Sequence, residues 1–449
     1  MRPRPSLWRQ PAFLVLWTGQ TISLVGSAVT TVALPLAAIA VLRASAFQVG
    51  LLTAATYAAF AFVSLPAGVV VDRLRKRPIM IWCDSARLVI MGSVPVAAAF
   101  HWLTLAQLYT VALAAGVCAV FFDVSEQSFV SHLLEPDDLT EGFGKLGASA
   151  SFAQVSGRGL ASALVAVIGA ARAITADALS YAVSVASLFL LKAHEPRPER
   201  KSGGIRQLRR DVAEGLTFIT RHPILRMTTA CVAAGNLFIA MQISLNLLFL
   251  VRVLDVRPAL AGLLTALGSL GGIAGGMLAA SIGRRFGSAR VLCFSHLVFA
   301  APALLLPLAE PGWGVVLFVV GYGASAFACS IFSASQIAYR QSICPPELRG
   351  RMNAASRWIT WGTLPVGGLL GGIIGSAIGI RPSIWIAYAG LWATDLLVIF
   401  SPLRRARNVS DLAPDGTPAA GLGAQTTSRL RPNARARHRL ARLRPAARW

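Results

Sequence analysis

The residues of this sequence that could do chemistry are charged side chains placed inside long apolar segments. Asp123 and Glu126 lie three residues apart in segment 104–130, so a helix there projects both carboxylates from one face. Two neighbouring carboxylates can exchange a proton or bind a cationic substrate. This makes them candidates for coupling proton movement to another process. Arg87 lies at a similar depth in segment 79–100, and a fixed ion pair with Asp123 is the structural alternative.

A second candidate is Arg158, deep in the apolar segment 143–170. A charge near the centre of a membrane costs about 2.5–3.5 kcal/mol, so such a residue usually faces a cavity or a partner. Arginine keeps its proton, so Arg158 is no proton shuttle, but it could bind an anionic substrate or anchor a carboxylate. Arg357 and Asp395 lie at similar depths in their apolar segments, which predicts a structural ion pair between them. Asp177 is also expected to have a structural role.

Uncharged amides inside the apolar segments form a third set. Gln242 and Asn246 are four residues apart and therefore share a helix face. The set could form the hydrogen-bonding wall of a substrate cavity, or it could join helices to one another, and the sequence leaves both interpretations open. Its members are Gln20, Gln127, Asn236, Gln242, Asn246 and Gln336.

No catalytic or metal-binding pattern accompanies these residues. The sequence has no phosphate-binding glycine loop, no metal-ligand spacing and no Ser-His-Asp signature. Its six cysteines include no C-x-x-C pair, and we expect them to pack as small apolar residues. We therefore expect no enzymatic activity, no cofactor and no metal, and His296 is expected to be a single buried histidine.

The elements that must position these residues are membrane-spanning helices. Of the 449 residues, 55% are hydrophobic and 14% are charged, against about 25% charged in soluble domains. A helix needs about 20 mostly apolar residues to cross the bilayer, and segments of this length predict an all-α membrane protein rather than a barrel. The twelve predicted spans are 13–41, 48–71, 79–100, 104–130, 143–170, 173–191, 225–251, 259–282, 290–308, 313–339, 353–379 and 382–402.

Basic residues set the predicted orientation and domain plan. The chain has 42 Lys and Arg against 19 Asp and Glu, gathered between spans as in cytoplasmic loops and not in any nucleic-acid-binding module. Both termini are therefore expected in the cytoplasm. The predicted domains are a six-helix half over 1–191, a central cytoplasmic linker with an amphipathic helix over 192–226, a second six-helix half over 227–402 and a disordered basic tail over 403–449.

An internal repeat supports the division into halves. Gly50-Leu-Leu-Thr-Ala opens the second span, and Gly262-Leu-Leu-Thr-Ala opens the eighth. Gln127 precedes a Pro-x-x-Leu motif by nine residues, and so does Gln336. The two matches predict homologous halves of equal topology, as in transporters that bind substrate between parallel repeats.

The turn after the second span carries the most specific motif. Gly68-Val-Val-Val-Asp72-Arg73-Leu-Arg-Lys-Arg77 resembles the signature G-x-x-x-D-R-x-x-x-R/K of the major facilitator superfamily, and the resemblance extends over residues 10–402. It implies that fold, with a central cavity lined by the first, fourth, seventh and tenth spans. It further implies that Gly68 lets two helices approach closely, that Asp72 pairs at a cytoplasmic gate, and that Arg73 and Arg77 hold the turn among lipid headgroups.

Looser motifs resemble the branch of enterobactin and macrolide exporters: Leu16-Trp-Thr-Gly-Gln20, Asp84-x-x-Arg87 and Arg349-Gly-Arg-Met-Asn353. This resemblance implies a secondary transporter in the plasma membrane, surrounded by lipid, and we expect it to be a monomer. It would export an amphipathic small molecule (a drug, an antibiotic or a siderophore-like compound) in exchange for protons. Span five departs from the antiporters of the family, because Arg158 stands where they usually have proline. The alternatives are an uptake carrier of the same fold and a non-transporting membrane receptor or scaffold.

Overall fold

The computed structural model describes residues 7–135, 138–191, 205–344, 348–399, 402–405 and 407–408, and every regular element among them is helical. Eleven of its helical segments are long and apolar enough to cross a membrane, and one bent helix pair makes a twelfth span. The prediction of an all-α membrane protein with twelve spans is confirmed. The predicted tail lies almost wholly outside the described residues.

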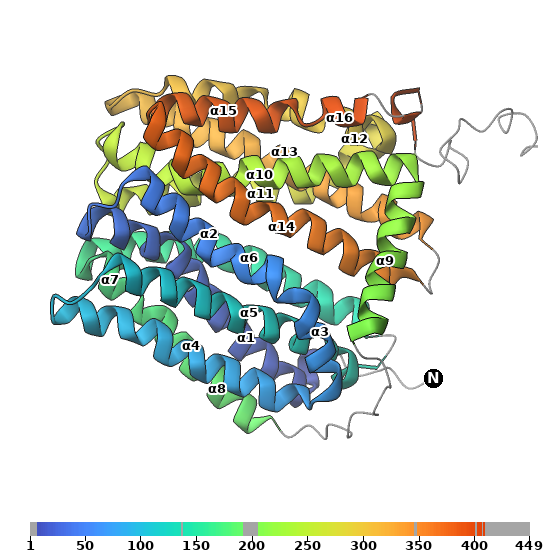
Figure 1. The fold of residues 1–449 in the computed structure, drawn as a ribbon, viewed down its shortest axis with the longest axis horizontal. Coiled ribbons are helices and arrows are strands. Elements are labelled where there is room, and N and C mark those ends of the chain that lie inside the picture. The colour runs from blue at the N-terminus through green and yellow to red at the C-terminus, as the bar shows by residue number, and fades with distance from the viewer. Residues whose placement is uncertain are drawn as a thin grey trace, which may run out of the picture.

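The helices form two packed groups, which occupy the lower and upper parts of Figure 1. The first group, which we call the N-half, consists of η1 (Leu7–Arg9), α1 (Pro11–Leu36), the π-helical turn η2 (Ala37–Val41), α2 (Ala46–Phe62), α3 (Ser64–Arg73), α4 (Lys76–Ala99), α5 (Leu105–Leu133), α6 (Leu139–Ile168), α7 (Ala170–Ala173) and α8 (Thr175–Leu190). The second group, the C-half, consists of α10 (Pro223–Arg252), α11 (Pro258–Phe286), α12 (Ser288–Phe299), the 3-10 helices η3 (Ala301–Leu308) and η4 (Gly312–Gly314), α13 (Val315–Ile343), α14 (Arg349–Ala377), α15 (Ile380–Ala393), α16 (Leu396–Ile399) and the 3-10 turn η6 (Pro402–Arg405).

Between the two groups, α9 (Ile205–Arg221) runs across one end of the spans (Figure 1). We call this the linker end and the other the opposite end. Glu214 of α9 forms an ion pair with Arg351 of α14, and Gly215 lies directly against the Arg351 backbone, where a Cβ would meet the carbonyl. The predicted amphipathic helix of the linker therefore exists and is fastened to the C-half.

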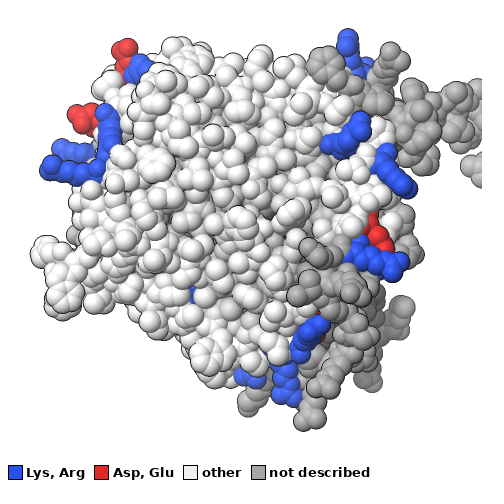
Figure 2. Space-filling model, in the orientation of Figure 1, with Lys and Arg blue, Asp and Glu red and all other residues white. Residues whose placement is uncertain are grey.

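The surface of the molecule has the charge distribution of a membrane protein. On the face shown in Figure 2, acidic and basic side chains gather at the two ends of the bundle and leave a broad uncharged belt between them. Large apolar side chains are exposed within the spans, among them Trp82, Val89 and Met277, each about three-quarters exposed. Such a belt is stable only against lipid, because exposed apolar surface of this extent is unfavourable in water.

Several spans are broken, which the sequence analysis did not predict. The second span bends by 50° at Val63, between α2 and α3. Pro66, in the first turn of α3, has no N–H for the Phe62 carbonyl, so the helix cannot continue straight through this point. The ninth span changes from α12 to the proline-containing 3-10 helix η3, and the twelfth is interrupted between α15 and α16.

The halves pack closely against each other where α2 meets α14 and where α6 meets α11. At the opposite end a Cβ on Gly50 would lie 2.6 Å from the Cα of Gly372, so this approach requires glycine at position 50. The Phe47 N–H donates to Ser376 Oγ beside it at 2.9 Å. Close helix approach was predicted at Gly68, but a Cβ there would meet no atom of the described residues within 4 Å.

Candidate functional site

The contact between the halves contains three of the predicted charged residues, and the first is Arg158. It lies on α6, about ten residues from the end of that helix at the opposite end of the bundle. Its Nη1 donates to Ser269 Oγ of α11 and, at 3.2 Å, to Tyr322 Oη of α13, and its Nη2 donates to Gln154 Oε1 at 3.0 Å. Arg158 thus reaches from the N-half to the C-half.

The second is Asp123, which lies on α5 nearer the linker end. Its Oδ2 lies 3.6 Å from Nη2 of Arg357 on α14, so this ion pair also joins the two halves. Both side chains are more than a third exposed, at 39% for Asp123 and 34% for Arg357. An ion pair with this much solvent access contributes about 0–1 kcal/mol, so it can break and re-form as the halves move.

The partners predicted for these charges from helical depth alone are wrong. Arg357 was expected to pair with Asp395, but it pairs with Asp123. Arg87, the alternative partner of Asp123, pairs instead with Asp84 on its own helix α4 at 3.3 Å, and its Nη2 also donates to the Cys118 carbonyl at 3.0 Å. Depth gives only one of the coordinates of a side chain, and the rotation of each helix about its axis decides the rest.

Glu126, the second carboxylate of the predicted coupling pair, lies half-buried on α5 one turn from Asp123. It forms no ion pair with any residue in the described part of the chain. The structure therefore places one paired and one unpaired carboxylate on the same helix, next to the contact between the halves. This arrangement is suited to exchanging a proton, because neither carboxylate is held in a fixed ion pair inside its own half.

Three of the amide residues take one of the two roles that the sequence left open. Gln242 donates to the Ala387 carbonyl at 3.2 Å, and Asn246 accepts from Tyr388 Oη at 3.2 Å, so both join α10 to α15 inside the C-half. Asn236 donates to the Thr360 carbonyl of α14 at 2.7 Å. These three residues serve helix–helix hydrogen bonding. Gln20 and Gln336 are buried in α1 and α13, and Gln127 is exposed on α5.

The signature turn lies at the linker end, at the end of α3. Asp72 is exposed and has no ion-pair partner among the described residues, and Arg73 is also exposed. Arg77 donates from Nε to the Leu188 carbonyl at 2.8 Å and from Nη2 to the Phe189 carbonyl at 3.1 Å. These carbonyls end α8 and have no partner within their helix, so Arg77 caps the sixth span.

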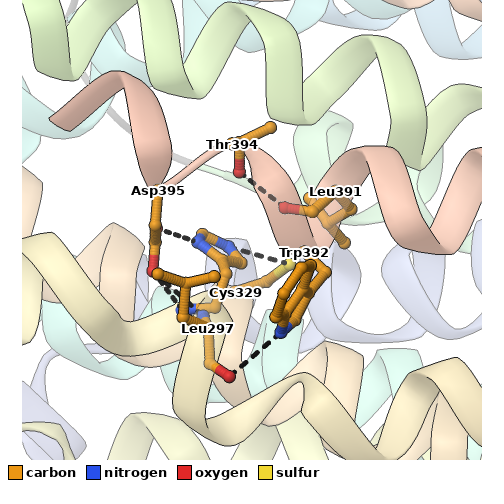
Figure 3. A network of polar contacts seen from close by, with 7 residues as sticks. Leu297, Cys329, Leu391, Trp392, Thr394 and Asp395 are labelled. Carbon is orange, nitrogen blue, oxygen red and sulfur yellow. Dashed lines mark hydrogen bonds and ion pairs between the residues drawn. The ribbon is translucent and has the colours of Figure 1, made fainter. Parts of the chain in front are cut away.

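Two buried polar clusters hold helices together within the halves. A structural role was predicted for Asp177 and for Asp395, but their partners were not. Asp177 accepts from Thr30 at 2.5 Å and from Ser27 at 3.3 Å, and fastens α8 to α1. In the C-half, Asp395 lies at the break of the twelfth span and accepts from His296 Nδ1 at 2.8 Å and from the His296 N–H at 2.7 Å (Figure 3). His296 is buried as expected but is not single, and its partner could have been sought among the few carboxylates of the C-half spans.

The Asp395 cluster includes further contacts around His296 and Leu297. Cys329 Sγ lies 3.8 Å from His296 Nε2, and Trp392 Nε1 donates to the Leu297 carbonyl at 3.0 Å (Figure 3). The Leu297 N–H donates to Asp395 at 3.1 Å. The carboxylate is completely buried and receives three donors, which satisfies it inside the apolar half and makes the cluster a link between α12 and the broken twelfth span.

Comparison with known proteins gives the relatives of this chain. The family model described as "Transmembrane secretion effector" matches residues 5–427. The chain is 22% identical to the multidrug efflux pump Tap of Mycolicibacterium fortuitum over 413 residues, which cover 88% of this chain and 97% of that protein. It is 23% identical to macrolide efflux protein A of Streptococcus pyogenes over 384 residues, which cover 84% and 92%.

Solved structures share the fold at lower identity. The nucleoside transporter NupG superimposes with a TM-score of 0.72 at 12% identity, covering 87% of this chain and 98% of that chain. A bacterial homologue of the iron transporter ferroportin in the inward-facing state superimposes with a TM-score of 0.71 at 15% identity, covering 88% and 99%. At these identities the similarity shows the arrangement of the helices and nothing about the substrate.

Proposed function

Because the chain belongs to the transmembrane secretion effector family of the major facilitator superfamily, and is therefore a membrane transporter and not an enzyme, we propose that it exports an amphipathic small molecule across the plasma membrane. The named efflux pumps among its relatives support the direction of transport. The substrate class is a drug, an antibiotic or a siderophore-like compound.

The observation that carries this proposal is the different character of the contacts between the halves at the two ends. The glycines of α2 and α14 pack at backbone distance at the opposite end. Nearer the linker end the halves meet through side chains, in the exposed pair Asp123–Arg357 and in the hydrogen bond from Trp358 Nε1 to the Ala61 carbonyl. Side-chain contacts can break and re-form more readily than a backbone contact, which supports a change between two states at the linker end. The basic loops support the proposal that the linker end and both termini face the cytoplasm.

We further propose that the carboxylates of α5 couple transport to protons. Asp123 has its cationic partner on the other half, so a separation of the halves at the linker end removes Arg357 from it. The carboxylate can then take a proton in place of the guanidinium, and Glu126 can share it. Asp123 would thus hold Arg357 when the halves meet at the linker end and a proton when they separate. Proton binding would then depend on the conformation of the protein, which is the requirement for coupling.

The test is a drug-susceptibility screen of strains that lack or overproduce the protein, followed by accumulation of each labelled compound that gives a difference. An exporter raises tolerance and lowers accumulation when it is overproduced. An uptake carrier does the reverse, and a receptor or scaffold changes neither. Accumulation that rises with overproduction, or equal accumulation of every compound in the two strains, would contradict the proposal.

A further inference from the structure

We propose that Arg158 anchors a site for an anionic group, a carboxylate or a phosphate, on the transported molecule. The inference rests on the proposed transport function and adds the chemical class of one substrate group. It follows from the charge balance inside the spans, from the donors that Arg158 leaves unused and from the way its helix face can be reached.

The charge balance sets Arg158 apart from the other guanidinium groups deep in the described spans. Arg87 has Asp84 at 3.3 Å, and Arg357 has Asp123 at 3.6 Å. Arg158 has no carboxylate within ion-pair distance among the described residues, and its three partners are a serine, a tyrosine and a glutamine. A full positive charge inside the membrane is thus solvated by neutral groups alone, which leaves it able to attract an anion.

The unused donors have the geometry that an anion needs. A guanidinium has five N–H groups. In Arg158, Nη1 makes two hydrogen bonds and Nη2 makes one. Nε and one N–H of Nη2 make no hydrogen bond to a described residue. Free N–H groups on Nε and Nη2 can bind the oxygens of one carboxylate or phosphate.

The site can be reached from the linker end. Gln154 lies one helical turn from Arg158 toward that end, on the same face of α6, and its side chain is exposed. Because Arg158 on this face contacts Ser269 and Tyr322 of the C-half, the exposed Gln154 lies beside the contact between the halves. An anion at Arg158 would therefore lie beside hydroxyl groups of the other half and would be held by both halves together.

The probe for this site is a pair of fluorescent compounds that differ only in charge, dansylglycine with a free carboxylate and the neutral dansylglycinamide. Binding is measured by fluorescence with the full chain in lipid nanodiscs. A charge-assisted hydrogen bond predicts that the wild type binds the carboxylate about tenfold more tightly than the amide. Arg158→Gln should abolish that preference, and Arg158→Lys should keep part of it, because lysine retains the charge without the paired donors.

Arg172→Gln is the matched control, because Arg172 is an exposed arginine of the same half and should leave the preference unchanged. A wild type without preference for the carboxylate, including one that binds neither probe, would overturn the proposal. So would Arg158→Gln if it kept the preference, or if it weakened both probes equally, which would make Arg158 only a latch between the halves. Binding in nanodiscs does not depend on the direction of transport. The anion-site proposal can therefore fail while the export proposal holds, and the export proposal can fail while the anion-site proposal holds.

Discussion

At the scale of single residues, the spans hold their charges in two different ways. Asp84 is completely buried beside Arg87, and the guanidinium also lies 4.8 Å over the Phe122 ring and 5.3 Å over the Tyr181 ring. Asp123 and Arg357 meet between the halves and stay partly exposed. The first pair is enclosed by one half and can only stabilise it, whereas the second can open.

Arg87→Ala should therefore destabilise the protein strongly. Removing one partner of a buried ion pair leaves the other charge buried and uncompensated, which costs about 3–5 kcal/mol. The measurement is thermal unfolding of the detergent-solubilised protein. Arg210→Ala is the control, because Arg210 pairs with Glu214 at 75% exposure and its loss should leave the unfolding temperature nearly unchanged. Equal unfolding temperatures for the two variants would show that the Asp84 pair is not structural.

The double variant Asp123→Asn, Glu126→Gln tests coupling. If the two carboxylates carry protons, the variant should fold and should exchange across liposomes a compound identified in the susceptibility screen. It should fail to concentrate that compound under an imposed pH difference. Gradient-driven uptake at nearly the wild-type rate would remove these carboxylates from the mechanism, and a loss of folding would assign them a structural role.

The residue types of the site were predictable from the sequence, but their partners were not. A charge within an apolar segment is visible in the sequence, and Asp123, Arg158 and Arg357 were found in that way. Which face of a helix meets which neighbour depends on packing between spans that lie far apart in the chain. For that reason Asp123 and Arg357, although each was recognised, were assigned to the wrong partners.

At the scale of the elements, α14 serves as the joint between the halves. Its glycines alternate between two faces: Gly367 and Gly371 lie against α10 of its own half, and Gly368 and Gly372 lie against α2 of the other. One helix with a glycine pair on each face can pack at backbone distance on two neighbours at once. The sequence Gly367-Gly-Leu-Leu-Gly-Gly372 contains this repeat, and only the structure shows what each face meets.

Gly372→Val should open the opposite end. A Cβ at this position would already meet the Ala46 carbonyl and the Gly50 Cα at 3.0 Å, so the larger side chain must push α2 and α14 apart. The measurement is disulfide cross-linking between cysteines introduced at Phe47 and Ser376, whose efficiency should fall several-fold. Gly362→Val on the same helix is the control, because a Cβ there meets no described residue within 4 Å. Unchanged cross-linking in Gly372→Val would show that the contact tolerates bulk.

At the scale of the whole molecule, the fold follows from hydropathy and length. Twelve apolar segments predicted twelve spans, and the described helices confirm them. The breaks in spans two, nine and twelve were not predicted, because a window of hydropathy averages over the prolines and the buried Asp395 that interrupt the helices. Single prolines are tolerated within other spans, such as α1 and α4, so their presence alone does not locate a break.

The orientation of the molecule in the membrane can be tested by cysteine labelling of intact cells. The six native cysteines are buried or half-buried. Replacing them gives a cysteine-free protein in which only an introduced cysteine can be labelled. A membrane-impermeant maleimide should label a cysteine introduced at Val256, in the loop between α10 and α11, and should not label one at Arg75 until the cells are opened. Labelling at position 75 alone would reverse the assigned orientation and, with it, the direction in which the linker end faces.

The pairing of α2 with α14 also bears on how the protein is made. Phe47 and Ser376, which meet at the opposite end, are separated by 329 residues in the chain. At translation rates of about 5–20 residues per second, α2 emerges from the ribosome roughly 20 seconds to one minute before its partner. During that time the glycine face of α2 must be covered by lipid, by the insertion machinery or by another helix, so assembly of the halves cannot be completed until nearly the whole chain has been synthesised.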